Sequence, residues 1–291
     1  MSANTSFHTY VANTNTILHD AYQQDRSSLM ELLGKFGKRI NIKAVSELLR
    51  NGADDQAIVK AIKANNSESA VGSSTSSSTS IMNNTARSSA IAASIKRIFT
   101  SHHIATNTIT NLLDIGSNNG AVTIQLGKEF NTTPANTHGI DIESYTYQQI
   151  DPLPGFDFQF YDGYNIPFQN NSIDLVTCLM VLHHVEYYGK TLSEIARVLV
   201  TGGYLVIKEH DAQSISIKRL VFIQHLLYDV LDYDADIDKF KSQHYYFETI
   251  FSQGTLVNFV TSFGFQLHGT VYNKHHNPTN SLMMVFSKIA L

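Results

Sequence analysis

The chain has 291 residues, of which 43% are hydrophobic and 16% are charged, and its formal net charge is −4. This composition predicts a globular protein with enough apolar residues for a core, and it excludes a basic field for nucleic acid over the whole surface. No apolar run approaches the roughly 20 residues of a membrane span. A single cysteine, Cys178, excludes an internal disulfide.

Two absences in the sequence bear on the compartment. The first residues lack the basic start and the apolar core of a signal peptide. Only one cysteine is present, which is typical of proteins in a reducing compartment. We therefore expect a cytoplasmic protein.

Apolar periodicity predicts a small N-terminal helical region, residues 1–66. Stripes at helical spacing run from Leu29 to Phe36 and from Val45 to Leu49. Gly52 is typical of a helix stop, and Asp54 is typical of the cap of a third helix. Several basic side chains lie in this region of an acidic protein: Lys35, Lys38, Arg39, Lys43, Arg50, Lys60 and Lys63. They form either a solvated helical face or a contact surface for a substrate or RNA.

A serine-rich tract, residues 67–89, interrupts the chain. It holds almost no apolar side chains to offset the entropy of ordering, so we predict a flexible linker and the main domain boundary there. The rest of the chain, residues 90–291, is the second predicted domain. It opens with a helix that carries Ile91 and Ile95.

The second domain is organised around a strand, a tight turn and a helix. Leu112 to Ile115 is a short apolar run with one acid, which predicts a buried strand. Gly116 to Gly120 is rich in glycine and asparagine, which tolerate the positive φ of a tight turn. An amphipathic segment follows from Val122 to Phe130. This order is typical of the opening unit of a nucleotide-binding α/β domain, although other α/β proteins share it.

Further strands are predicted at His138–Glu143, Phe156–Tyr161, Ile173–Cys178 and Tyr204–Ile207, with a helix over residues 192–200 before the last of them. An acid at the tip of the second strand can accept hydrogen bonds from ribose hydroxyls. Asp141 is favoured over Glu143 for this role because the strand should end near Asp141.

These motifs, in this order, resemble those of the class I S-adenosylmethionine-dependent methyltransferases, and in particular the type 11-like branch. Asp114 to Gly120 resembles the Asp-x-Gly-x-Gly-x-Gly loop. Asp162 with Ile166-Pro167-Phe168 resembles the acid-then-Leu-Pro-Phe segment beside the adenine. Asp174 to His184 resembles the fourth-strand motif, and Gly202 to Leu205 resembles the Pro-Gly-Gly motif before strand five.

The resemblance covers roughly residues 91–291. It implies a Rossmann-like α/β fold with a seven-stranded, mostly parallel sheet whose last strand is antiparallel, so that strands six and seven are Phe265–Tyr272 and Ser281–Ser287. Asn118 stands where the family's middle glycine is usual, and Thr201 stands in place of the usual proline. Asparagine tolerates the left-handed region well, so we expect the turn to survive.

The resemblance also implies S-adenosyl-L-methionine as the cofactor. The expected cofactor-binding residues are Asp114, Gly116, Ser117, Asn118, Gly120, Asp141, Ile142, Asp162 and Gly163. In this set, Asp114 orients the turn and, directly or through water, the ammonium of the cofactor's tail. Asp141 holds the ribose, and Asp162 accepts from the adenine amino group. Methyl transfer is an in-line displacement, so the enzyme mainly aligns the nucleophile, the methyl group and the sulfur.

Candidate catalytic residues follow strands four and five, where α/β sheets place their ligands. They are Glu209, His210, Lys208 and His183, and a structural role remains open for His183. The run from Lys208 to Asp211 holds four ionisable groups that cannot all be buried, so we expect some of them to face a cleft. Capping of a helix near Ser214 is the alternative role of Asp211. Tyr245 and Tyr246 are candidates for stacking on a planar acceptor. The cysteine–histidine spacing of a zinc site is absent, so we expect no metal.

The methyl acceptor and the oligomeric state remain open, and the acceptor is a small molecule, RNA or a protein; no membrane partner is expected. Lys208 resembles a lysine of ribose 2′-O methyltransferases, which favours RNA or cap methylation. The aspartate and glutamate that accompany that lysine have no counterpart at residues 178–180 and 282–285. A catalytically inactive binding module of the same fold is the other alternative, against which the acids Asp114, Asp141 and Asp162 argue.

Overall fold

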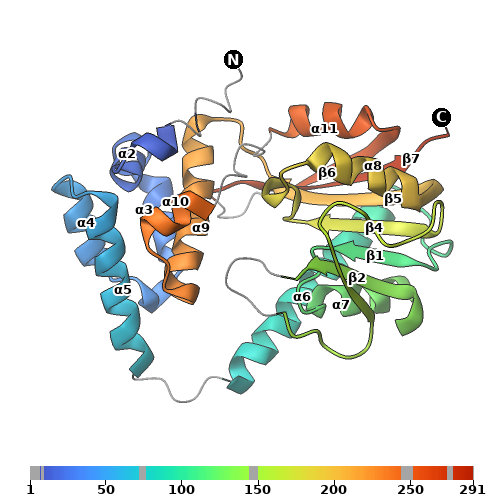
Figure 1. Ribbon diagram of the computed structural model, residues 1–291, viewed down its shortest axis with the longest axis horizontal. Helices are drawn as coiled ribbons and strands as arrows, with labels where there is room; N and C mark the ends of the chain where they lie inside the picture. The colour runs from blue at the N-terminus through green and yellow to red at the C-terminus, as the bar shows by residue number, and fades with distance from the viewer. Residues whose placement is uncertain are drawn as a thin grey trace. The chain divides into compact units, whose positions relative to one another are not determined.

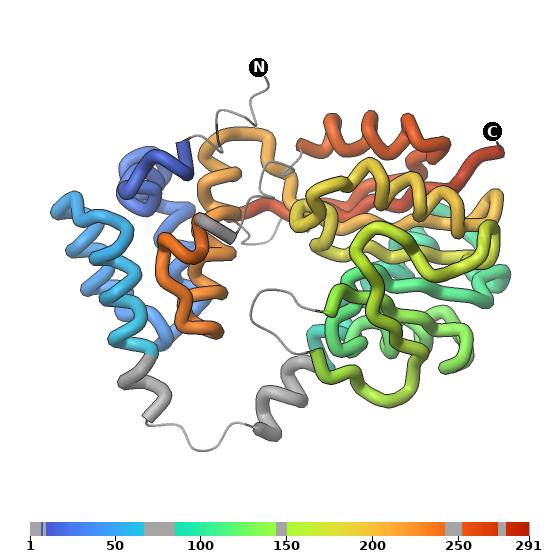
Figure 2. The backbone as a smooth tube through the Cα atoms, viewed as in Figure 1, coloured from blue at the N-terminus to red at the C-terminus, as the bar shows by residue number. Residues whose placement is uncertain are grey.

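The computed structural model describes residues 7, 10–71, 77–143, 150–243, 252–273 and 278–290 (Figure 2). The chain forms two compact units. Unit 1 comprises Met1–Ser76, His210–Ser252 and Asn273–Ser281. Unit 2 comprises Ser77–Glu209, Gln253–Tyr272 and Leu282–Leu291.

Unit 2 is built on a seven-stranded sheet with the strand order β3-β2-β1-β4-β5-β7-β6 (Figure 1). The strands are β1 (Leu112–Ile115), β2 (Thr137–Ile142), β3 (Asp157–Tyr161), β4 (Ile173–Leu179), β5 (Leu199–His210), β6 (Phe265–Asn273) and β7 (Ser281–Lys288). Neighbouring strands from β3 to β5 are parallel, and the other end of the sheet is antiparallel. The predicted Rossmann-like α/β fold is confirmed.

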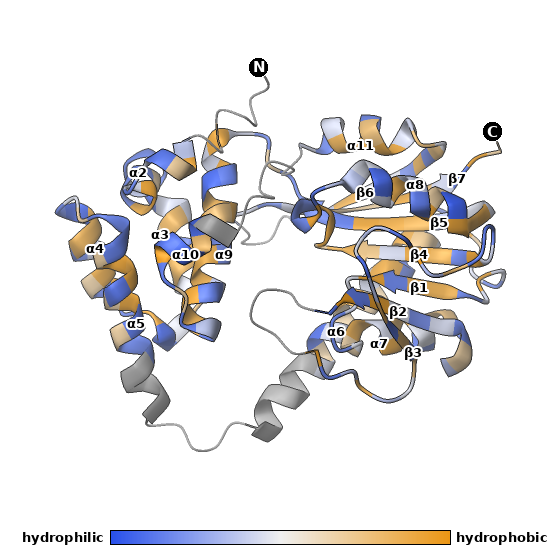
Figure 3. Cartoon of the chain, in the orientation of Figure 1, coloured by the Kyte–Doolittle hydropathy of each residue, from blue (hydrophilic) through white to orange (hydrophobic). Residues whose placement is uncertain are grey.

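Burial explains which sequence runs became central strands. β1 is buried at all four positions, and β4 is buried at five of seven, as expected of parallel strands covered on both faces. Figure 3 shows the hydrophobic character of β4 and β5. The flanking helices are α6 (Ser77–Ser101), α7 (Ala121–Phe130), α8 (Tyr188–Val198) and α11 (Gln253–Thr261). α6 and α7 pack with Leu112, Leu175 and Val206 in one apolar cluster.

The described part of unit 1 is mostly helical. Its elements are α2 (Ile17–Gln24), α3 (Arg26–Gly34), η1 (Gly37–Arg39), α4 (Ile42–Arg50), α5 (Asp55–Val71), α9 (Ile215–Tyr233) and α10 (Ile237–Gln243). The N-terminal helices α2, α3 and α5 pack against α9, and together they enclose an apolar core. The Asp54 cap is confirmed, since its carboxylate accepts the backbone N–H of Ala57 at 2.8 Å.

Several predicted boundaries differ from the structure. β5 begins at Leu199, so Gly202 and Gly203 lie inside the strand, and α8 ends at Val198. In the predicted serine-rich linker, residues 67–71 belong to α5 and residues 77–89 belong to α6, while residues 72–76 lie outside the described residues. The compact units also change between residues 76 and 77, and two segments of the predicted second domain belong to unit 1. None of the described helices combines the length and the apolar character needed to cross a membrane.

Candidate active site

The turn after β1 has the backbone geometry predicted for it. Gly116, Asn118 and Gly120 have φ angles of 69°, 50° and 80°. Asn118 therefore adopts the left-handed conformation expected at the position of a usual glycine, and its side-chain Oδ1 accepts the backbone N–H of Asn119 at 2.6 Å. A Cβ atom on Gly116 would lie 2.4 Å from Cγ2 of Val181, so the glycine lets an apolar side chain after β4 pack directly on the turn.

Asp141 lies at the carboxyl end of β2 and is connected to this turn. Its Oδ2 accepts the backbone N–H of Asn118 at 2.7 Å, and its Oδ1 accepts the backbone N–H of Ile142 at 2.8 Å. Burial raises the pKa of Asp141, and the two backbone donors oppose that rise. The side chain remains partly exposed. A half-buried carboxylate beside a turn with positive φ angles is suited to accept hydroxyl donors from a ligand.

Asp114 lies at the same edge of the sheet but is 3% exposed. Its Oδ2 accepts the hydroxyl of Thr123 on α7 at 2.6 Å, and its Oδ1 accepts the hydroxyl of Thr177 on β4 at 2.6 Å. Burial raises the pKa of Asp114 to about 6. Neither threonine was among the predicted site residues. Thr177 could have been identified in the sequence as a hydroxyl side chain within an otherwise apolar strand.

Asp162 follows β3 and is exposed. Its Oδ1 accepts the backbone N–H groups of Tyr164 and Asn165 at 2.8 and 2.7 Å, and these bonds, that of Asn165 first, lower the pKa of Asp162. Gly163 in this turn has a φ of 81°. Asp162 thus shapes a tight turn and presents it to solvent.

Two residues of α8 that the sequence analysis missed support the Ile166-Pro167-Phe168 segment. Glu194 accepts the backbone N–H of Ile166 at 2.9 Å, and Arg197 donates to the backbone carbonyls of Ile166 and Phe168 at 2.8 Å each. Glu194 and Arg197 also form an ion pair at 2.7 Å. Their i,i+3 spacing on one predicted helix could have identified Glu194 and Arg197 as an ion pair from the sequence.

Of the four ionisable groups at the end of β5, only Lys208 is partly exposed. Glu209, His210 and Asp211 are 2%, 3% and 2% exposed. Each is buried with partners: Glu209 accepts from Nδ1 of His183 and from the backbone N–H of Leu182, at 2.5 and 2.8 Å. His210 lies 3.2 Å from the Thr279 carbonyl through Nδ1, and Asp211 accepts from the Gln213 side chain at 2.6 Å.

The predicted role of Asp211 as a helix cap is wrong, because Ser214 caps α9 by accepting the backbone N–H of Ile217 at 3.3 Å. Lys208 differs from its neighbours and is partly exposed. Burial, and then the positive charge of Arg87 on α6, lower the pKa of Lys208. Tyr245 and Tyr246 lie outside the described residues.

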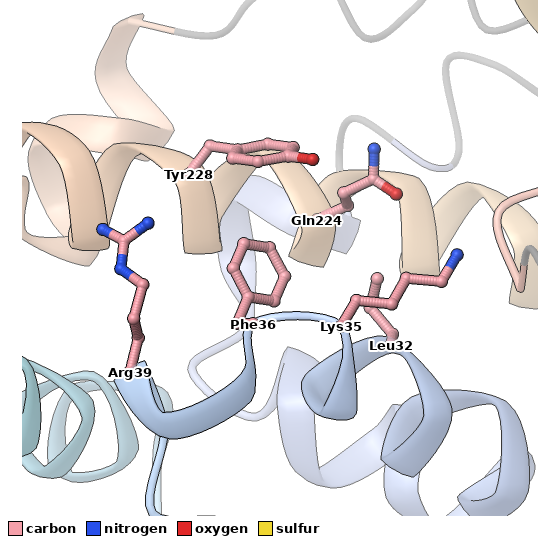
Figure 4. Close-up of a pocket in the computed structure, with 6 residues that line it drawn as sticks. All are labelled: Leu32, Lys35, Phe36, Arg39, Gln224 and Tyr228. Carbon is pink, nitrogen blue, oxygen red and sulfur yellow. The ribbon is translucent and has the colours of Figure 1, made fainter. Parts of the chain in front are cut away.

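A separate pocket of about 210 Å³ lies within unit 1, between the end of α3 and α9 (Figure 4). Its lining residues are Leu32, Lys35, Phe36, Arg39, Gln224 and Tyr228. Arg39 donates to the Leu231 carbonyl at 2.6 Å and forms an ion pair with Asp232 at 2.7 Å. Two of the basic residues singled out in the sequence thus lie at this pocket, and one of them is engaged in an ion pair.

Known proteins resemble the central part of the chain. A family model described as "Methyltransferase domain" matches residues 113–207. The phthiotriol/phenolphthiotriol dimycocerosates methyltransferase 1 of Mycobacterium ulcerans is 36% identical over 76 residues, which are 25% of this chain and 28% of that protein. The demethylmenaquinone methyltransferase of Renibacterium salmoninarum is 35% identical over 74 residues, 25% of this chain and 31% of that protein.

The chain therefore spans less than a third of the length of these two curated relatives. Among solved structures, an S-adenosylmethionine-dependent methyltransferase from Methanosarcina mazei is 18% identical, covers 62% of this chain and 93% of its own, and has a TM-score of 0.41. The family model begins at the second residue of β1 and ends at Ile207 in β5, so it takes in the turn, Asp141 and the residues after β4. On this match, the central part of the chain, residues 113–207, resembles a methyltransferase domain.

Proposed function

We propose that the protein is an S-adenosylmethionine-dependent methyltransferase. The observation that carries this proposal is the half-buried carboxylate of Asp141, which lies at the end of β2 and accepts the backbone N–H of Asn118 in the positive-φ turn. In α/β sheets of this kind, ligands bind outside the carboxyl ends of the strands at a change of strand order. That change falls between β1 and β4 here, directly beside the turn.

The residues present fit this cofactor. The turn from Gly116 to Gly120 offers exposed backbone at Asn118, Asp141 offers a carboxylate to ribose hydroxyls, and the exposed turn at Asp162 and Gly163 offers acceptors for an adenine amino group. Ser117 and Ile142 would contribute backbone on either side. The bound cofactor would supply an electrophilic methyl group on a sulfonium. The task of this chain is then to orient the acceptor in line with that methyl group and to exclude water.

Lys208 is the candidate acceptor-side residue that the geometry favours. It lies at the carboxyl end of β5, in register with Leu179 of β4. Its lowered pKa brings its amine closer to the neutral form, which can accept a proton from a hydroxyl acceptor. The contacts of Glu209 and His183 with one another favour a supporting role for both of these predicted catalytic residues, and the carbonyl contact of His210 favours the same.

We propose a small organic molecule as the acceptor. The two named relatives act, by their names, on a phthiotriol-type lipid and on demethylmenaquinone. RNA or cap methylation is less favoured, because the acids that accompany the lysine in ribose 2′-O methyltransferases have no counterpart here. A cytoplasmic location goes with this proposal, supported by the single, buried cysteine.

The test is calorimetric titration of the full chain with S-adenosylmethionine and with its demethylated product. We expect micromolar binding that is lost in Asp141→Ala. Asp157→Ala is the matched control, because this acid also lies on the sheet but at the amino end of β3, where it pairs with His138. No binding by the folded wild-type chain would overturn the enzyme proposal and leave a binding module of the same fold.

A further inference from the structure

The acid that opens the glycine-rich motif, Asp114, is not placed as a ligand-binding group. Asp114 is 3% exposed, and both of its carboxylate oxygens accept hydroxyl hydrogens at 2.6 Å. Its two donors, Thr123 and Thr177, are themselves 0% exposed. No ion pair to Asp114 occurs within the described part of the chain, and the charged group that acts on it is another acid, Asp141.

The two threonines come from different elements on either side of the turn. Thr123 belongs to the first turn of α7, directly after Gly120. Thr177 belongs to β4 and is paired in register with Asp114 of β1. The carboxylate therefore joins the strand before the turn, the helix after it and the neighbouring strand. Three elements that meet at the turn are held through one buried group.

The far side of the turn is held by a second acid. Gly116 and Ser117 donate their N–H groups to the Ile140 carbonyl of β2 at 2.9 and 3.2 Å, and Asn118 donates to Asp141. A displacement of the turn would therefore move the backbone proposed to face the methionine part and also the carboxylate proposed to face the ribose. The turn and Asp141, at the two ends of the proposed cofactor site, therefore move together.

We propose that Asp114, Thr123 and Thr177 form a clamp that positions the turn, and that Asp114 does not contact the ammonium of the cofactor's tail. This inference rests on the proposed function. It keeps the turn-orienting role that the resemblance implies for Asp114 and removes the contact with the ammonium. It also assigns to the support of the cofactor site two threonines, Thr123 and Thr177, that the sequence analysis did not single out.

The two roles make opposite predictions for ligands that differ in the amino-acid tail. S-adenosylhomocysteine carries the tail and its ammonium, whereas 5′-methylthioadenosine carries the adenosine and the sulfur without them. Loss of a clamp weakens both ligands, because the turn and Asp141 move together. Loss of a direct contact with the ammonium weakens only the ligand that has one.

The experiment measures the affinity of both ligands by calorimetry at pH 8, where Asp114 is charged, for the wild type and four variants. Thr177→Val and Thr123→Val each remove one hydroxyl at nearly constant volume, and Thr177→Ser keeps the hydroxyl. Asp114→Asn removes the charge but keeps a planar group of the same size, to which a rotated threonine hydroxyl can bond.

We expect Thr177→Val to weaken both ligands by about tenfold, the equivalent of one buried hydrogen bond. Thr177→Ser should restore wild-type affinity for both, and Asp114→Asn should stay within about threefold for both. Thr123→Val gives the same test from the α7 side if Thr177→Val does not fold.

Tenfold weaker binding of S-adenosylhomocysteine alone in Asp114→Asn would overturn the clamp and establish the direct contact. Unchanged affinities in both valine variants would overturn it as well. Either result leaves the proposed function intact. Failure of the folded wild-type chain to bind either ligand would overturn the proposed function, and the clamp with it.

Discussion

Nδ1 of His183 lies 2.5 Å from Oε2 of Glu209, and the two side chains are 1% and 2% exposed. The other oxygen of the Glu209 carboxylate accepts the backbone N–H of Leu182 at 2.8 Å. The pair thereby joins the segment after β4 to the end of β5. A carboxylate that is buried and bonded at both oxygens holds two elements together, and it is poorly placed to take a proton from an acceptor.

Glu209→Ala should destabilise the protein by about 3–5 kcal/mol, because it leaves a buried imidazole and a buried backbone N–H without their acceptor. Chemical denaturation followed by circular dichroism measures the change, since the chain has no tryptophan. Glu186→Ala is the matched control: this glutamate is exposed in the same loop, so the change should stay within about 0.5 kcal/mol. A Glu209→Ala protein of wild-type stability that has lost methyl transfer would instead make Glu209 a catalytic residue.

Asp114 should make stability depend on pH in a direction opposite to that of an ordinary ion-paired acid. Its pKa is about 6 in the folded chain, above its unfolded value, so the folded state binds more protons between about pH 4 and pH 6. The Asp114 contribution to stability therefore falls as pH rises through this window, by up to about 3 kcal/mol for a shift of about two pKa units.

Asp114→Asn removes this contribution. The difference in unfolding free energy, variant minus wild type, should become more positive from pH 4 to pH 7 and stay constant above pH 7. Subtracting the wild-type value cancels the contributions of other titrating groups to the pH dependence. One of these is Asp229, whose pKa is also raised to about 6 by burial. A difference that is flat over the whole range would mean that the folded Asp114 carboxyl titrates normally.

Local patterns predicted the first five strands of unit 2 and the turn after β1, whereas strands six and seven and the antiparallel end came from the family resemblance. β1 was predicted at its exact bounds, and the turn was predicted with Asn118 in the left-handed region, because apolar runs and turn residues act within a few positions of each other. The start of α5 at Asp54 could be predicted from the sequence for the same reason. β5 was predicted too short, because Thr201 and Gly202 look like a loop, whereas β5 already pairs with β4 at Leu199, in register with Ile173.

The support of the site depends on contacts that a linear reading does not reveal. Asp114 and Thr177 are 63 positions apart, and register between two strands brings them together. The run from Glu209 to Asp211 looked too polar to bury because its partners, including Thr279, come from distant segments. The serine-rich stretch lacks the apolar periodicity of a helix, yet residues 77–89 are helical as the start of α6, which Ile95 and Phe99 anchor in the core.

The Gly116→Ala substitution should cost about 2–4 kcal/mol, because it combines a positive φ of 69° with a Cβ that would lie 2.4 Å from Val181. Gly202→Ala separates the two effects. Gly202 has a φ of 80° and no atom within 4 Å of the added Cβ, so only the backbone strain of about 1–2 kcal/mol should remain. Thermal and chemical unfolding measure the loss of stability in both variants. Equal losses would show that the Val181 side chain moves away from the added Cβ without losing its packing.

In unit 1, two adjacent acids hold helix starts in different ways, and removing them should have different costs. Asp54 caps its own helix from an exposed position, so Asp54→Ala should cost about 1 kcal/mol. Asp55 is 0% exposed and accepts the backbone N–H groups of Ile17 and Leu18 at 3.0 and 2.9 Å, at the start of α2. Asp55→Ala leaves both donors buried without an acceptor, at a cost of about 2–4 kcal/mol.

Asp55→Asn retains one acceptor oxygen and should fall between the two alanine variants. Amide hydrogen exchange at Ile17 and Leu18 gives a local readout beside the global unfolding free energy. Faster exchange at these two amides in Asp55→Ala, with unchanged exchange there in Asp54→Ala, is the expected pattern. Equal exchange in both variants would mean that packing of Ile17 and Leu18 in the core, and not the carboxylate, fixes the start of α2.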